Sequence, residues 1–510
     1  KYPVRDPFFL MIRRSLNTFM NAFTSSDYTA YPFASQNRKD FNNLLGIYLD
    51  AVFFPRLDPL DFAQEGHRIE LENPDDPDSP LVYKGVVFNE MKGDTSSPVS
   101  VLYDGIKAAL FEHSTYHHNS GGDPEVIPQL TYQGLLDFYR THYHPSNAVF
   151  MTYGDIPAAE LQASLESLAL HRFDRLDEKI AVVPEPRFSE PRRAEIEYAV
   201  DEDDGRKSHV VMGWLLGENT DLEMLLKCNL MSDVLLDTSA SPLRKALETS
   251  DLGAAASPLC GLEESNFEMS FFCGLEGCEA DSAEAIEALV LETLQQVAEE
   301  GVPVDSLEAC VHQLELNQRE IGGDGYPYGL QLMFSCMSAA IHNGDPIGLL
   351  DLNHVVSKIR SEMQDPAFMG NLIRELLLDN SHRVTLTMKP DTRFAEKQRQ
   401  RETDRLAALK AQMTRQDIDA LLEKSRELNE RQAQPEPLEV LPKVGLEDIS
   451  DSLANPQGTS KTLKAGPRLT TYDAGTNGLS YHQIVCALPA LDEELTGVLP
   501  LYSSLVTEIG

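Results

Sequence analysis

Two stretches of this chain end in the same order of local signals. Residues 144–157 read HPSNAVFMTYGDIP, and residues 380–393 read NSHRVTLTMKPDTR. Each contains a helix end, a polar turn, about six strand-forming residues and a break at Pro and Asp. Strand and helix patterns precede both endings. This weak internal repeat predicts an α+β fold in which two similar sheet-and-helix domains follow each other.

The length of the chain fits several domains. Its 510 residues suffice for about three domains, each with its own core. The Pro-rich segment VPEPRFSEPRR at residues 183–193 predicts a linker after a first domain of residues 1–182. We expect a second domain at residues 194–390 and a helical hairpin at residues 391–435, in which TRQD at residues 414–417 forms a capping box. The start of an incomplete third domain is expected at residues 436–510.

Hydrophobic periodicity predicts individual elements within these domains. Apolar residues three and four apart predict helices at residues 38–54, 131–142, 281–300 and 305–342. Runs of β-branched, aromatic and other apolar residues between turn residues predict strands at residues 147–153, 383–388, 469–472 and 479–488. The strands at residues 147–153 and 383–388 are each expected to close a domain.

The stretch LVYKGVVFNEMKG at residues 81–93 is a short apolar run that ends on one carboxylate, Glu90. A helix is expected to begin at Val86, with Val86, Val87 and Glu90 on one face because they lie three and four apart. That face is expected to be buried, and a buried carboxylate must be paired, protonated or bound to a metal. The alternative is a solvated Glu near a helix start, which the helix dipole favours.

Several ungapped segments carry a resemblance to a known family. They are KYPVRDPFF at residues 1–9, NTFMNAFTSSDYTAYPF at 17–33, GVVFNEMKG at 85–93, SGGDPEVIPQLT at 120–131, YHPSNA at 143–148 and TNGLSYHQIVCALP at 476–489. In these segments the chain resembles the inverzincin zinc metallopeptidases, the pitrilysin and insulinase superfamily, and within them the presequence proteases. The resemblance implies repeated metallopeptidase domains, each a mostly antiparallel sheet packed with helices, joined by a helical hairpin.

The resemblance implies that zinc is the cofactor and that Glu90 is its third protein ligand. In this family an H-x-x-E-H helix just before the KYP segment supplies two His ligands and the general base. None of the 13 His residues forms that motif, and the chain begins at Lys1. We therefore expect a fragment with one zinc ligand and no catalytic residue of its own. Its expected partners include the remaining N-terminal and C-terminal parts of the same enzyme.

The resemblance also implies two substrate-binding features. An exposed edge strand beside the zinc, to which a peptide adds through backbone hydrogen bonds, is matched by Asn21, Ala22, Phe23 and Thr24. This edge is expected to face the same cavity as Glu90, and an internal sheet strand is the alternative. Phe8 and Phe9 match positions that line an apolar pocket near the scissile bond. Plain core packing of a helix is the alternative for either of them.

Three His residues offer a rival metal site. His113 and His117 have the i, i+4 spacing of two ligands on a helix, and His118 follows directly. The polar residues between them and the Asn-Ser-Gly-Gly that follows favour a loop with solvent-exposed His. The Gly-rich segments lack the Lys of a phosphate loop, and no G-x-S-x-G or reactive-Cys motif stands out.

The net charge of -38 limits the partners of the protein. Such a field repels nucleic acid and attracts cationic peptides, although solubility alone is the alternative. Seven scattered Cys residues without a C-x-x-C motif are typical of a reducing compartment. No run of 18 apolar residues occurs, so neither a membrane span nor a membrane partner is expected. The expected protein is soluble, cytoplasmic if bacterial and in an organelle matrix if eukaryotic.

The resemblance implies the function, and the charge refines it. The expected activity is that of a zinc metalloendopeptidase that degrades unfolded peptides such as targeting peptides, by attack of zinc-bound water on the peptide bond. Basic peptides are the expected substrates, and the chain alone is expected to be inactive. The alternative is a non-catalytic homologue that acts as a structural or partner-binding subunit.

Overall fold

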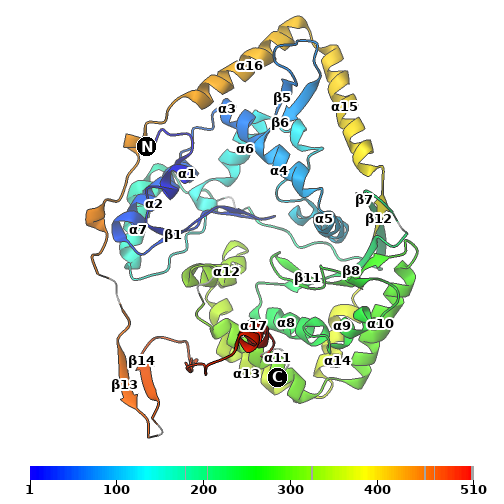
Figure 1. Cartoon of the computed structure of the whole chain (residues 1–510). Coiled ribbons are helices and arrows are strands. Elements are labelled where there is room, and N and C mark those ends of the chain that lie inside the picture. The colour runs from blue at the N-terminus through cyan, green and yellow to red at the C-terminus, as the bar shows by residue number, and fades with distance from the viewer. Residues whose placement is uncertain (178–179, 204, 323–324, 453–454, 465, 507–510) are drawn as a thin grey trace. The chain divides into compact units, whose positions relative to one another are not determined.

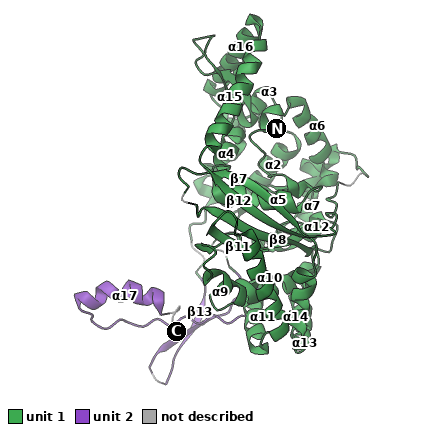
Figure 2. Ribbon diagram, turned by 90° about the vertical axis from the view of Figure 1, so that its right-hand side faces the viewer, with its two compact units in different colours: residues 1–318, 322–455 green, residues 319–321, 456–510 purple. Residues whose placement is uncertain are grey.

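The computed structural model describes residues 1–177, 180–203, 205–322, 325–452, 455–464 and 466–506. They fall into two compact units. One contains residues 1–318 and 322–455, and the other contains residues 319–321 and 456–510 (Figure 2). Helices and small sheets together build the larger unit, so the prediction of an α+β fold is confirmed.

Short antiparallel hairpins and helices make up the first part of the larger unit. Strand β1 (Asn17–Met20) pairs with β4 (Phe33–Ser35), and β2 (Phe23–Thr24) pairs with β3 (Thr29–Ala30) further along the same hairpin. A second hairpin consists of β5 (Arg68–Leu71) and β6 (Leu81–Lys84). The helices around them are α1 (Pro7–Ile12), α2 (Arg38–Phe53), α3 (Pro59–Asp61), α4 (Val86–Asp94), α5 (Pro98–Leu110), α6 (Tyr132–His142) and α7 (Ala158–Leu168).

The second part of the larger unit contains a mixed sheet of six strands. Its order is β10-β11-β8-β12-β7, and β9 pairs with β11 beside this path. Strand β12 is antiparallel to β8 and parallel to β7. The strands are β7 (Arg192–Ala199), β8 (Ser208–Glu218), β9 (Ala255–Ala256), β10 (Gly261–Glu263), β11 (Glu268–Cys278) and β12 (Arg383–Asp391). The helices of this part are α8 (Leu222–Leu236), α9 (Pro242–Glu248), α10 (Ala283–Glu300), α11 (Val304–Arg319), α12 (Tyr328–Ile341), α13 (Leu352–Glu362) and α14 (Phe368–Ile373).

Helices cover both faces of this sheet. Figure 1 shows α8, α9 and α10 on one side of β8 and β11, and α5 on the other. Met212 and Trp214 of β8 pack into the core on the side of α8 and α10, while Val211 and Leu215 pack against α5. Both faces of β8 are therefore buried, which explains why its sequence, SHVVMGWLLGE, is a continuous apolar run and does not alternate with polar residues.

A glycine lets α5 lie close to the sheet. A Cβ atom at Gly105 would lie 2.4 Å from Ile196 Cδ1 of β7, which is closer than any real contact. Helix α5 belongs to the first part of the chain, yet its buried residues Leu102, Ile106 and Leu110 complete the core of the second-part sheet. The two parts therefore share a core.

The helical hairpin is confirmed. It consists of α15 (Phe394–Gln412) and α16 (Arg415–Ala433), and the Thr414 side chain and the Asp417 carboxylate form the predicted capping box. Leu406 of α15 and Ile418 of α16 pack on Leu71 and Leu81 of the β5–β6 hairpin.

The smaller unit contains one antiparallel pair and one helix. Strand β13 (Gly458–Thr462) pairs with β14 (Arg468–Tyr472), and the helix is α17 (Glu493–Leu505). The strand prediction at residues 469–472 is thus confirmed. No helix among the described residues combines the length and apolar character that crossing a bilayer requires.

Three predictions of local structure are wrong. Residues 147–153 and 479–488 form no strand, since no neighbouring strand pairs with them in the part of the chain that the structure describes. The helix predicted at residues 305–342 is two helices, α11 and α12. Gly322, Gly325 and Pro327 lie between them, and such residues disfavour a continuous helix.

Candidate peptide-binding site

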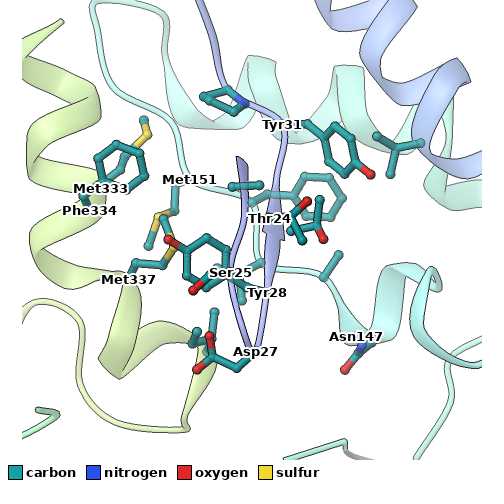
Figure 3. A pocket seen from close by; sticks show the side chains of 18 of the residues that line it. Thr24, Ser25, Asp27, Tyr28, Tyr31, Asn147, Met151, Met333, Phe334 and Met337 are labelled. Atoms are coloured by element: carbon teal, nitrogen blue, oxygen red, sulfur yellow. The ribbon is translucent and has the colours of Figure 1, made fainter. Parts of the chain in front are cut away.

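A cavity of about 1950 Å³ opens in the larger unit. Three kinds of segment line it: the hairpin from Thr24 to Tyr31, the extended segment at residues 147–156, and helix α12. Figure 3 shows Met151, Met333, Phe334 and Met337 on one side of the hairpin and Tyr31 on the other. The lining is largely apolar, with a few polar groups near the tip of the hairpin.

The hairpin reaches the cavity through short pairings. Met20 lies opposite Phe33, Asn21 N–H donates to Pro32 O at 3.1 Å, and Phe23 lies opposite Ala30. Strand β2 pairs with β3 on one edge, and in the described structure no strand pairs with its other edge. Such an edge keeps unpaired backbone N–H and C=O groups available to another chain.

The predicted substrate strand lies on this hairpin. Asn21, Ala22 and Thr24 are exposed, and Phe23 is half-buried. The phenyl ring of Phe23 packs edge-to-face on Phe334 of α12, with ring centroids 5.6 Å apart. Thr24 is the member of the four that lines the cavity. The amide N–H of Ala22 donates to the Asn21 side-chain oxygen at 2.9 Å, so a neighbouring side chain occupies this donor.

Phe8 and Phe9 lie together on α1 and do not line the cavity. Their rings meet edge-to-face with centroids 5.2 Å apart. Phe9 is 65% exposed, so core packing does not account for it.

The carboxylate of Glu90 lies on the open face of helix α4. Val86 and Val87 are 52% and 37% exposed, and Glu90 is exposed as well. The prediction that this face is buried is therefore wrong. Helix α4 instead buries Phe88 and Met91 against Ile127, because these larger side chains share the face that meets the chain around them. Glu90 is not among the residues that line the cavity.

The rival His group does not converge on a metal. Residues Thr115–His117 form a single 3₁₀ turn. The His113 ring bonds to Glu185 Oε1 at 2.9 Å, whereas the His117 ring bonds to the carbonyl of Phe111 at 2.9 Å. Burial alone would raise the pKa of Glu185, but hydrogen bonds from His113 and from backbone N–H groups hold that pKa below its ordinary value. These contacts fix a loop between two segments of the chain.

Zinc ligands do not converge in the described part of the chain. No group of three His, Cys, Asp or Glu side chains that could hold a metal ion occurs there. The donor set of these residues thus fits one position of a zinc site, Glu90, and not a complete site.

Sequence reasoning missed one wall of the cavity. Met333, Phe334 and Met337 of α12 and Met151 of the facing segment line it. The segment LQLMFSCMSAAI has apolar residues three and four apart, which indicates a helix with an apolar face. That pattern is also typical of core packing, so it did not mark a binding wall.

Comparisons with known proteins match the whole chain. A family model described as "Peptidase M16 inactive domain" matches residues 129–314, and a model of the region associated with subfamily C of the M16 peptidases matches residues 388–510. "Presequence protease, mitochondrial" from Xenopus tropicalis is 39% identical over all of this chain and 50% of the relative. "Presequence protease 1, chloroplastic/mitochondrial" from Arabidopsis thaliana is 37% identical over all of this chain and 48% of the relative. The chain spans about half the length of the curated relatives it matches.

Solved structures share the fold. A protease from Helicobacter pylori has a TM-score of 0.56 at 16% identity, with 75% of this chain and 84% of that one covered. A peptidase M16 inactive domain from Pseudomonas fluorescens has a TM-score of 0.51 at 12% identity, with 73% and 81% covered. The chain therefore belongs to the M16 peptidase family, the inverzincins that its sequence resembles, and within it to the presequence-protease group.

Proposed function

We propose that the protein containing this chain is a zinc metalloendopeptidase that cleaves unfolded peptides, such as targeting peptides, in an organelle matrix. The observation that carries the proposal is the 39% identity, along the whole chain, to a protein named mitochondrial presequence protease. Because the chain spans 50% of that relative, the activity is assigned to the intact enzyme, and this chain supplies part of it.

In this proposal the chain supplies a peptide-binding wall. The free edge of β2 lies at the cavity, next to Met151 and α12 (Figure 3). An extended peptide that enters there gains backbone hydrogen bonds to β2, and these demand little of its sequence. Its apolar side chains meet the Met and Phe side chains of α12, and Met adapts to differently shaped neighbours. Folded proteins are poor substrates, because their backbone groups are already paired.

We assign to Glu90 one ligand position of the zinc site. Its carboxylate is exposed, and no hydrogen bond or ion pair engages it within the described part of the chain. Zinc accepts a carboxylate oxygen beside His ligands. The other ligands and the general base are assigned to the rest of the intact enzyme. Bound zinc would supply Lewis-acid activation of water at neutral pH, while the residues of this chain bind and orient the peptide.

Cleavage of an unfolded basic peptide tests the function. We expect the intact enzyme to cleave it, and chelation to stop the reaction. Because the net charge is -38, kcat/KM is expected to fall about tenfold from low to physiological salt. The 510-residue chain alone is the control and is expected to be inactive. Chelator-sensitive cleavage by that chain would contradict the assignment of a single ligand. A salt-independent rate would show that the acidity serves solubility only.

Ala22→Pro in the intact enzyme tests peptide addition to the edge. Proline removes the Ala22 N–H, which bonds to the Asn21 side chain and to no strand of the hairpin. The hairpin itself should therefore fold. We expect KM for long peptides to rise about threefold to tenfold, the effect of one lost hydrogen bond, with kcat little changed. Ala22→Ser keeps the N–H and is the matched control. Equal KM values for the two variants would argue against edge addition here.

One observation favours a second function. The matching model for residues 129–314 describes an inactive domain, so this part of the chain is typical of a portion without catalytic groups. If the intact protein binds the basic peptide, holds no zinc and cleaves nothing, a peptide-binding or structural subunit is the better assignment.

A further inference from the structure

The tip of the cavity hairpin holds a buried carboxylate. Ser25 N–H donates to Tyr28 O at 2.8 Å and closes the turn, and the side chain of Asp27 inside this turn is 1% exposed. Asp27 Oδ2 accepts the Tyr116 hydroxyl at 2.7 Å and lies 2.9 Å from His342 Nε2. Burial of a carboxylate is costly unless hydrogen bonds or an opposite charge compensate it. These two partners supply that compensation.

The partners of the tip come from both sides of the cavity. Tyr116 lies in the 3₁₀ turn Thr115–His117, and its oxygen also accepts Phe267 N–H at 2.8 Å. His342 directly follows α12, which forms the facing wall. Thr115 Oγ1 donates to Ser26 O at 2.8 Å, on the same turn. The tip is thus tied at once to the segment behind the hairpin and to the helix across from it.

The Tyr116 hydroxyl is a stable donor in this cluster. Burial and the neighbouring Asp27 charge raise its pKa, so the hydroxyl keeps its proton at neutral pH. The strands themselves contribute little to the position of the hairpin, because β2 and β3 pair over two residues each. A hairpin of this length is only marginally stable without other contacts. Its place in the cavity therefore depends on the tip.

We propose that Asp27 is a positioning residue for peptide binding: through Tyr116 and His342, its carboxylate holds the open edge of β2 at a fixed place opposite α12. The inference rests on the proposed function, since the peptide is taken to add to that edge. It concerns binding and not bond cleavage, because Asp27 acts through the hairpin.

Two isosteric variants of the 510-residue chain test the anchor. Asp27→Asn removes the charge, and Tyr116→Phe removes one hydroxyl and keeps the ring that packs on Phe111. Tyr103→Phe is the matched control, because it removes a hydroxyl that bonds to Glu263 and lies outside the hairpin contacts. Hydrogen exchange of residues 17–35 and the fluorescence anisotropy of a labelled unfolded basic peptide are measured. Both anchor variants are expected to exchange about tenfold faster at β2 and β3 and to bind about tenfold more weakly.

Kinetics of the intact enzyme separate positioning from general loss of structure. We expect Asp27→Asn and Tyr116→Phe to raise KM about tenfold and leave kcat nearly unchanged, as loss of uniform binding predicts. His342→Ala should behave like Asp27→Asn, whereas His342→Gln retains an N–H donor and should restore most of the binding. Lower kcat with unchanged KM would overturn the inference.

The two measurements distinguish failure of this inference from failure of the proposed function. Unchanged exchange and binding in both anchor variants would overturn the inference alone. Faster exchange in the variants, combined with no peptide binding by the parent chain or the intact enzyme, would overturn the proposed function and the binding role of Asp27 with it.

Discussion

Replacement of Glu90 by Gln in the intact enzyme is expected to abolish zinc retention and to lower kcat/KM by more than about a hundredfold. Gln has nearly the same shape but lacks the charge that makes a carboxylate a good zinc ligand. Even groups that only orient zinc ligands typically change affinity or activity by about 10–100-fold, so a direct ligand should cost more. The measurements are zinc content by mass spectrometry and cleavage of an unfolded peptide.

The exposure of Glu90 makes this experiment clean. Its side chain supports no contact within the described residues, so the substitution should not disturb helix α4, which is held by Phe88 and Met91. Glu72→Gln, another exposed carboxylate of the same part, is the control and should keep zinc and activity. Full zinc content and full activity of the Glu90 variant would remove this residue from the metal site.

Acid is expected to destabilise the larger unit through His382, the second large effect. This fully buried ring stacks on Phe188 with centroids 3.7 Å apart. Its Nε2–H donates to Leu110 O at 2.8 Å, and its Nδ1 accepts Phe188 N–H at 3.3 Å, so both nitrogens suit the neutral form. Burial lowers the pKa of His382 to about 4.

The sign of the effect follows from proton uptake. An unfolded His has a pKa of about 6.5, so between this value and about 4 the unfolded chain binds a proton that the folded ring does not. The stabilisation is complete above about pH 6.5 and is lost as the pH falls towards 4. At about 1.36 kcal/mol per pKa unit, it amounts to about 3 kcal/mol.

Denaturant unfolding of the chain at several pH values measures this contribution. His382→Gln cannot titrate, so its free energy of unfolding should fall less between pH 7 and 4 than that of the parent, by about 3 kcal/mol. Carboxylates titrate in both proteins and cancel in the difference. His354→Gln replaces an exposed His and should follow the parent curve. Parallel curves for His382→Gln and the parent would contradict the assignment.

Much of the fold follows from local sequence, and the reason is the short range of the signals. The hairpin of α15 and α16 was predictable because apolar stripes and the Thr414–Asp417 capping box act within a few residues of each other. The same holds for α2 and α6, whose apolar residues repeat at helical spacing. The family was recognisable because long segments such as GVVFNEMKG carry their resemblance in the sequence itself.

Other features depend on which surfaces meet, and periodicity does not specify this. The pattern of α4 showed an apolar face at Val86 and Val87 but not that Phe88 and Met91 would be the buried side chains. Residues 147–153 have strand-forming residues, yet a strand also needs a neighbour to pair with. The packing of α5 on the second-part sheet likewise joins segments that are distant in sequence.

The sequence by itself determined the family, the α+β class and the local elements, because each rests on residues close together in the chain. The tertiary structure decided how the cavity is built. Tyr116 and His342 lie 89 and 315 positions from Asp27 and meet it only in the fold. Bringing such groups together depends on the burial of cores on both faces of a sheet, a property of the whole chain that no local pattern contains.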